Sequence, residues 1–404
     1  MVVEPLAAQR MRDRTLDYAQ TVSVDGGDVV RVRGVAGDGA RVVHLDSMDQ
    51  MASEVSHGGS QSPLVCAVAE DEIRCFVPDQ GAYRPLEVTV LPERADVFDR
   101  VRGVFETDVL RDRSVAVLGL GSGGSVITRE LARSGVGRFL LVDHDRLEIG
   151  NVCRHECGLS DVGRLKTNAV AEMVLDRNPN ARITTRSVHI GGATVDELSL
   201  AIEQADVDLV VCATDNRESR MLVNRLCVLA GLPALYAGVF RRAYGGQVLR
   251  YIPGLSPCYQ CFVSALPAME RDQEVSSAAD ASAVAYTDRP VAVEPGLSSD
   301  IAPIALLVAK LALQELLSGT PTTLASLDED LVAPLYLWLN RREQDTEYVS
   351  WQPMATGVDE MSVLRWYGIG LPRNESCSVC GDMTVEGVAP DEMLDLSAFQ
   401  SPEA

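Results

Sequence analysis

Apolar residues in the middle of the chain fall into short runs, and segments of helical periodicity separate these runs. Such an alternation is typical of an α/β fold with a mainly parallel sheet. The β-branched-rich runs predict buried strands at residues 114–120, 138–143, 210–212, 233–239 and 246–252. Helical patterns predict helices at residues 125–134, 219–230 and 300–317. We therefore expect a doubly wound, Rossmann-like sheet.

The N-terminal part of the chain has a different pattern. Short β-like runs, separated by Asp-Gly, Gly-Gly and Pro-Asp turns, lie at residues 29–35, 41–45, 64–68, 73–77 and 86–91. Residues 1–97 are therefore expected to form a small β or α+β module with a structural or partner-binding role. We expect the main domain at residues 98–384, with a mobile loop at residues 267–290, and an acidic, disordered tail at residues 385–404.

The first predicted strand of the main domain ends in a glycine-rich turn that contains Gly119, Gly121, Gly123 and Gly124. Gly119 suits the tight turn, Gly121 lets backbone N–H groups approach a phosphate, and Gly124 allows close packing of the helix on the strand. Asp143 ends the next strand, where this fold places a carboxylate on the ribose hydroxyls. A nucleotide site is predicted, although glycine-rich turns also occur without nucleotide and in dinucleotide-dependent oxidoreductases.

Polar residues suited to triphosphate chemistry follow these strands: Asp145, Asn151, Arg154, Lys166, Asp215 and Asn216. A hydride-transferring dehydrogenase has no need for two cations beside the ribose. Transfer from a nucleoside triphosphate does need cations, because negative charge develops on the phosphates during the transfer. Arg154 and Lys166 would neutralise that charge. It also needs a carboxylate for Mg²⁺, and Asp215 follows an apolar strand, where doubly wound sheets bind their ligands.

Four of the ten cysteines form two Cys-x-x-Cys pairs, Cys258 with Cys261 and Cys377 with Cys380. Two such pairs supply the four thiolates of a tetrahedral zinc site, so we expect a structural Zn²⁺ that ties the C-terminal part to the main domain. A redox role is the alternative, and it would need only one pair. Cys153 and Cys157 lack the spacing and the further ligand that a second metal site would require.

Charge and hydropathy exclude several classes of function. The chain has 36 basic and 58 acidic residues, a formal net charge of −22, and such a field repels nucleic acid and anionic membranes. No apolar run approaches the length of a membrane span, and residues 1–20 contain no apolar signal segment. We therefore expect a cytoplasmic protein that binds neither nucleic acid nor membrane.

In these motifs the sequence resembles the ubiquitin-activating-enzyme-like adenylyltransferases, a family that includes the bacterial activators of the thiamin and molybdopterin sulfur-carrier proteins. The resemblance covers residues 98–380: the glycine-rich turn, Asp143, an Asn-x-x-Arg element at Asn151, a Gly-x-x-Lys element at Gly163, a Thr-Asp-Asn strand end at Thr214, and both cysteine pairs. His155 stands where the family usually has glutamine, which puts one phosphate or transition-state contact in doubt. The resemblance implies an antiparallel extension of the sheet.

The resemblance also implies an activity. With ATP and Mg²⁺, such an enzyme adenylates the C-terminal carboxylate of a ubiquitin-like or sulfur-carrier protein, or of a short peptide, and releases pyrophosphate. Asn151, Arg154, Lys166 and Asp215 would be catalytic, and the four turn glycines, Asp143, Asp145, Asn216 and Arg100 would bind the nucleotide. A catalytically silent scaffold subunit is the main alternative.

Three further expectations come from the same resemblance. The family forms dimers in which an N-terminal arginine reaches ATP of the partner, and Arg100 or Arg102 would be that residue here, an ordinary surface arginine being the alternative. Relatives that form a thioester carry a cysteine near the crossover loop, but residues 262–376 contain none. Some relatives are fused to a zinc isopeptidase-like domain, whose paired-histidine element His44 and His57 do not form, so such a module would be inactive here.

Overall fold

The computed structural model describes residues 1–3, 5–15, 17–24, 29–36, 39–45, 64–69, 72–79, 82–90, 97–101, 105–266, 296–322, 326–344, 346–354 and 360–381. The chain folds as two compact units, residues 1–96 and 97–404. The predicted mobile loop at residues 267–290 and the predicted tail at residues 385–404 lie outside the described residues, as does Arg102. No helix in the described ranges is both long and apolar enough to cross a membrane.

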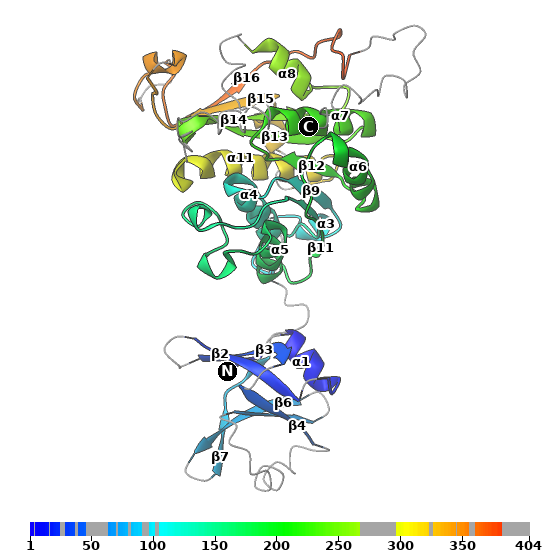
Figure 1. The fold of residues 1–404 in the computed structure, drawn as a ribbon, viewed down its shortest axis with the longest axis vertical. Helices are drawn as coiled ribbons and strands as arrows, with labels where there is room; N and C mark the ends of the chain where they lie inside the picture. Colours follow the sequence, from blue (N-terminus) through cyan, green and yellow to red (C-terminus); the bar gives the residue numbers. More distant parts are fainter. Residues whose placement is uncertain are drawn as a thin grey trace, which may run out of the picture. The chain divides into compact units, whose positions relative to one another are not determined.

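The larger unit is built on one mixed sheet (Figure 1). Its described strands lie in the order β11-β10-β9-β12-β13-β14-β15-β16; the first five are parallel, and β14, β15 and β16 add antiparallel pairs at one edge. Their bounds are β9 Ser114–Leu118, β10 Arg138–Val142, β11 Arg182–Arg186, β12 Leu209–Cys212, β13 Ala234–Val239, β14 Gly245–Tyr251, β15 Leu335–Leu339 and β16 Trp366–Ile369. The expected doubly wound α/β class with an antiparallel extension is confirmed.

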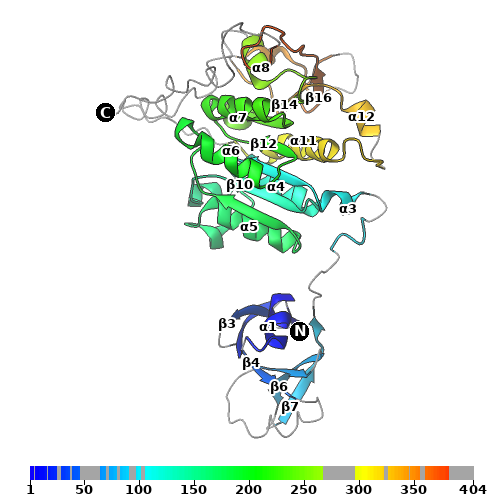
Figure 2. The same ribbon diagram turned by 90° about the vertical axis from the view of Figure 1, so that its right-hand side faces the viewer.

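Helices cover both faces of this sheet (Figure 2). In the described residues the α-helices are α3 Thr107–Leu110, α4 Ser122–Arg133, α5 Lys166–Arg177, α6 Val195–Gln204, α7 Arg217–Ala230, α8 Tyr259–Ala265, α11 Ser298–Leu316 and α12 Ser326–Asp330. Helices α4, α5 and α11 share one apolar core with Val115 and Val117 of β9, whereas α6, α7 and α8 share the other with Ala116 and Leu118. Side chains of a strand point alternately to opposite faces, so a strand between two helical layers must be apolar at every position.

Two of the predicted helices begin earlier than their apolar periodicity does. Helix α4 begins at Ser122, because Gly121 supplies an extended N-cap and the first turn carries glycines in place of apolar residues. Helix α7 begins at Arg217, because the Asn216 side chain accepts a hydrogen bond from Ser219 N at 2.8 Å. Both helices therefore begin at the residues expected to bind nucleotide.

In its described residues the smaller unit is a β domain with one helix, α1 Pro5–Arg12. Its described strands lie in the order β7-β6-β5-β4-β2-β3-β1-β8. Their bounds are β1 Val2–Val3, β2 Tyr18–Val24, β3 Val29–Ala36, β4 Ala40–His44, β5 Val65–Ala69, β6 Glu72–Asp79, β7 Ala82–Leu86 and β8 Thr89–Val90. Four of the five predicted runs are strands. The prediction of a single strand at residues 86–91 was wrong. It contains the end of β7, which pairs with β6, and then β8, which pairs with β1.

Candidate nucleotide site and metal centre

The candidate nucleotide site lies where the connections of the parallel sheet change direction. Strand β9 has β10 on one side and β12 on the other, and ligands of doubly wound sheets bind at the carboxyl ends of such strands. Gly119 follows β9 with φ +91°, and a Cβ at this position would lie 2.8 Å from Ala213 O. The glycine-rich turn therefore abuts the turn after β12, and only glycine fits this contact.

The glycines of the turn differ in the space around them. A Cβ at Gly124 would lie 2.0 Å from Gly119 O, so this glycine is needed for the helix to leave the strand at once. Gly121 faces open space, and Gly123 has its nearest neighbour, Ile301 Cγ2, at 3.8 Å. The first backbone hydrogen bond of α4 joins Ser125 N to Gly121 O, and the N–H groups before it are available to an anion.

Asp143 holds the glycine-rich turn in place. Its Oδ2 accepts a hydrogen bond from Leu120 N at 2.7 Å, and its Oδ1 accepts one from Asp145 N at 2.8 Å. The side chain is buried, at the carboxyl end of β10. Each carboxylate oxygen has a second lone pair, so the predicted contact with the ribose is compatible with this backbone role.

Lys166 and Asp145 form an ion pair beside the turn. Lys166 is only 8% exposed, and its Nζ lies 2.7 Å from Asp145 Oδ2. Burial by itself would raise the pKa of the Asp145 carboxyl, but the hydrogen bond and charge of Lys166 outweigh it and lower that pKa. The main role of Asp145 in this structure is therefore to pair with Lys166 and hold its ammonium at the site.

Residues 146–165 form a loop whose ends meet in a bridge between Arg146 and Leu165. Asn151 shapes the loop, because its Oδ1 accepts a hydrogen bond from Glu148 N at 3.0 Å and its carbonyl accepts from the N–H groups of Arg154 and His155. Arg154 is half-buried, and no described residue accepts a hydrogen bond from its guanidinium. This cation is thus available to a bound anion.

Asp215 lies exposed after β12, where the sequence placed it. Asn216 caps α7 through its side-chain oxygen, so its predicted nucleotide contact would come from the amide nitrogen or from the second lone pair of that oxygen. Arg220 was not predicted from the sequence; this buried residue donates to Thr214 O at 2.6 Å and to Ala237 O at 3.1 Å. It fixes the turn that carries Asp215, and the available signal was an arginine at helical spacing from the apolar residues Val223 and Cys227.

Arg100 lies exposed in a turn at residues 97–101, and the described part of this segment is not helical. No hydrogen bond or ion pair joins Arg100 to a described residue of the site. Its predicted contact with the nucleotide of a second copy stays a prediction.

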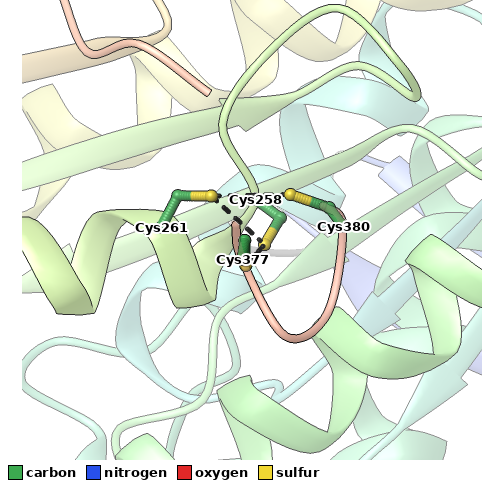
Figure 3. A group of neighbouring side chains, drawn as sticks. All are labelled: Cys258, Cys261, Cys377 and Cys380. Carbon is green, nitrogen blue, oxygen red and sulfur yellow. Dashed lines mark hydrogen bonds between the residues drawn. The ribbon is translucent and has the colours of Figure 1, made fainter. Parts of the chain in front are cut away.

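The four predicted cysteines converge in one cluster (Figure 3). Cys258 and Cys261 lie at the start of α8, and Cys377 and Cys380 lie in the turns after β16. Sγ–Sγ distances are 3.9 Å for Cys258–Cys261, 3.8 Å for Cys258–Cys377 and 3.4 Å for Cys261–Cys380. A zinc tetrahedron with Zn–S bonds of about 2.3 Å has edges of about 3.8 Å, so the cluster fits a Cys₄ zinc ion.

Backbone and amide N–H groups surround these sulfur atoms. Asn224, a buried residue of α7, donates to Cys258 Sγ at 3.6 Å and accepts from Tyr259 N at 2.8 Å. Val379 N donates to Cys377 Sγ at 3.5 Å. Such donors stabilise thiolate charge and orient metal ligands. Asn224 was not predicted from the sequence, because nothing local links a helix asparagine to a cysteine 34 positions away.

Comparison with known families agrees with this geometry. The model of the ThiF family matches residues 95–334, which is more than half of the 404-residue chain. The chain belongs to the ThiF family. The resemblance expected from the motifs is thereby confirmed, and the family match includes the glycine-rich turn, the loop at residues 146–165 and the first cysteine pair.

Curated relatives of this ThiF-family chain include the ubiquitin-like modifier-activating enzyme 5 of Oryza sativa subsp. japonica, 34% identical over 224 residues. That match covers 53% of this chain and 51% of the relative. The Dictyostelium discoideum protein of the same name is 34% identical over 161 residues, which cover 38% of this chain and 42% of the relative. The chain thus matches about half or less of the length of these relatives.

Among solved structures, the chain is similar to E. coli MccB with ATP, at 20% identity and a TM-score of 0.46, covering 68% of each chain. It is also similar to the microcin C7 biosynthetic enzyme MccB in complex with N-formylated MccA, at 20% identity and a TM-score of 0.47, covering 68% of this chain and 69% of that one.

Proposed function

We propose that this ThiF-family chain is an ATP- and Mg²⁺-dependent adenylyltransferase. It would join AMP to the C-terminal carboxylate of a ubiquitin-like or sulfur-carrier protein, or of a short peptide, and release pyrophosphate. The observation that carries the proposal is the arrangement at the end of β9, where the glycine-rich turn abuts the turn leading to Asp215 and the Lys166–Asp145 pair lies beside it. A dinucleotide-dependent oxidoreductase has no use for this set of charges.

The proposed reaction forms a bond between a carboxylate oxygen and the α-phosphorus of ATP and breaks the bond between that phosphorus and the oxygen leading to the β-phosphate. No general base is needed, because a carboxylate is ionised at neutral pH. Arg154 and Lys166 would neutralise charge on the phosphates, and the free N–H groups of α4 would bind one of them. Asp215 would hold Mg²⁺, which supplies further charge neutralisation, since its exposed carboxylate has no described partner.

Exchange of labelled pyrophosphate into ATP tests this function. A small carrier protein ending in Gly-Gly and a short peptide are to be supplied separately, because each presents the free carboxylate that the reaction requires. The names of the curated relatives support the carrier protein as the first candidate. Absence of exchange with every candidate would favour the silent scaffold.

A cytoplasmic location stays a prediction.

We expect the activated product to remain an acyl-adenylate until an outside nucleophile attacks it. Cys157 is buried, and burial raises its pKa to about 12, so it is a neutral thiol near pH 7. Cys153 is exposed, but its backbone belongs to the loop that carries Asn151 and Arg154. Carrier incubated with enzyme and ATP should therefore yield no covalent adduct on a non-reducing gel. A thiol-labile adduct that disappears in Cys153→Ala would refute this expectation.

If the protein is a homodimer in which Arg100 reaches the partner's nucleotide, two inactive variants should complement each other. Arg100→Ala and Asp215→Ala homodimers would each be impaired, whereas a mixed dimer would contain one site with both groups intact. Mixing the variants under conditions of subunit exchange should restore part of the pyrophosphate exchange. Full activity of a strictly monomeric enzyme would rule out a role for Arg100 in trans.

A further inference from the structure

The His155 side chain joins the loop at residues 146–165 to the glycine-rich turn. Its imidazole is buried, Nε2 lies 2.8 Å from Leu120 O, and Nδ1 lies 3.0 Å from Cys157 N. A backbone N–H can only donate, so Nδ1 accepts, and a carbonyl can only accept, so Nε2 carries the proton. Both contacts are satisfied together only by the neutral Nε2–H tautomer.

This contact reaches the two parts of the site that handle phosphate. Leu120 lies between Gly119 and Gly121, and it is hydrogen-bonded on both sides, through its N–H to Asp143 and through its carbonyl to His155. On the loop side, His155 directly follows Arg154, and both backbone N–H groups donate to Asn151 O at 2.9 Å. The position of the imidazole therefore sets the distance between the Arg154 backbone and the turn.

We infer that His155 is a positioning residue that fixes Arg154 against the glycine-rich turn, and that it does so only as a neutral imidazole, so that protonation of His155 switches adenylation off. Protonated, the ring carries an N–H at both nitrogens, and Nδ1–H would then face Cys157 N–H, donor against donor. The inference rests on the proposed function, because its activity readout is adenylation.

Burial is the main influence on the titration of His155, and it lowers the pKa of the imidazole below its usual value near 6.5. The hydrogen bond to Leu120 O opposes this shift. Among the charged groups that face the ring, Lys166 of α5 also lowers the pKa, whereas Glu156 of the loop and Asp143 of β10 raise it. Glu156 is in turn paired with Arg129 of α4. Since the pKa is lowered, the contact is intact at neutral pH and is lost as the pH falls through that lowered pKa.

A non-titrating side chain can make the same two contacts. The glutamine amide combines an N–H donor with a carbonyl acceptor, so His155→Gln should hold the loop at every pH at which the fold is stable. Alanine has neither group. His155→Ala should therefore lower pyrophosphate exchange by about ten-fold or more at neutral pH, in line with the loss of two buried hydrogen bonds, and His155→Gln should recover most of that loss.

The decisive measurement is the pH profile of kcat/KM for ATP, which reports groups of the free enzyme. Wild type should have an acidic limb below about pH 6.5, and His155→Gln should lose that limb while groups common to both proteins still titrate. An unchanged limb in His155→Gln would overturn the inference, as would full activity of His155→Ala.

A second measurement does not depend on activity. NMR of protein labelled with ¹⁵N in its histidines should show one imidazole that is absent in His155→Gln, is a neutral Nε2–H tautomer at pH 7, and titrates below 6.5. Charged His155 at pH 7 would refute the inference even if exchange fails with every carrier. Lack of exchange alongside the expected spectrum would instead refute the proposed function.

Discussion

Lys166→Ala is expected to lower ATP–pyrophosphate exchange by at least about 100-fold, the usual cost of removing an electrostatic contact to a transition state. Lys166 is 8% exposed and its ammonium is held by Asp145 beside the turn, so water would replace it poorly. Removing the lysine also takes away the cation that lowers the pKa of Asp145. The Asp145 carboxylate is then left unpaired by Lys166, and its negative charge would repel the phosphates. Initial rates of exchange at saturating ATP and carrier would measure the loss.

A matched control comes from the other end of the same helix. Arg177 ends α5, is exposed and pairs only with the adjacent Asp176 among its described neighbours, so Arg177→Ala should keep the wild-type rate. Asp215→Ala should cost as much as Lys166→Ala, whereas Asp196→Ala, at an exposed position of α6, should cost nothing measurable. Equal thermal stability of all four variants would assign the losses to chemistry. Wild-type exchange in Lys166→Ala would remove the lysine from the proposed mechanism.

Cys258→Ser is expected to lower the stability of the larger unit strongly. The molecules that remain folded should keep their catalytic activity. Zinc binding contributes on the order of 10 kcal/mol to the folding of small thiolate sites, and loss of even a third of that would lower Tm by roughly 5 °C or more. The cluster joins α8 to the segment after β16, so the C-terminal segment should detach first. Metal analysis with thermal unfolding should find one zinc per chain in wild type and a depleted, less stable variant.

Cys153→Ser is the control for this experiment, because Cys153 is exposed and lies outside the cluster. It should retain its zinc and its Tm. Acid should also release the metal, because burial raises the pKa values of the Cys258 and Cys261 thiols and protons then compete for the ligands. A metal-free wild-type preparation with an unchanged unfolding transition would show that the cysteines are only core residues.

Local chemistry was enough to predict much of this molecule. Apart from Ser114, which begins β9, strands β9 and β12 are apolar at every position because helices cover both of their faces, and that pattern is visible in the sequence. Gly119 and Gly124 are needed for a turn in which a Cβ would collide with backbone, and the two Cys-x-x-Cys pairs could close one tetrahedron. The strands and the glycine turn are each made of neighbouring residues, and each cysteine pair is a local motif, although the two pairs lie 119 positions apart.

The tertiary structure decided how the polar residues are used, because a side chain with several possible partners bonds to whichever group the fold brings near. Lys166 meets Asp145 because the ends of the loop at residues 146–165 come together, and Asn216 caps a helix through its oxygen. His155 faces Leu120 and Cys157, contacts that span 35 and 2 positions, so the sequence showed only a departure from glutamine. Apolar periodicity is a local property, but hydrogen-bond partnership depends on which loops meet at the carboxyl ends of the strands.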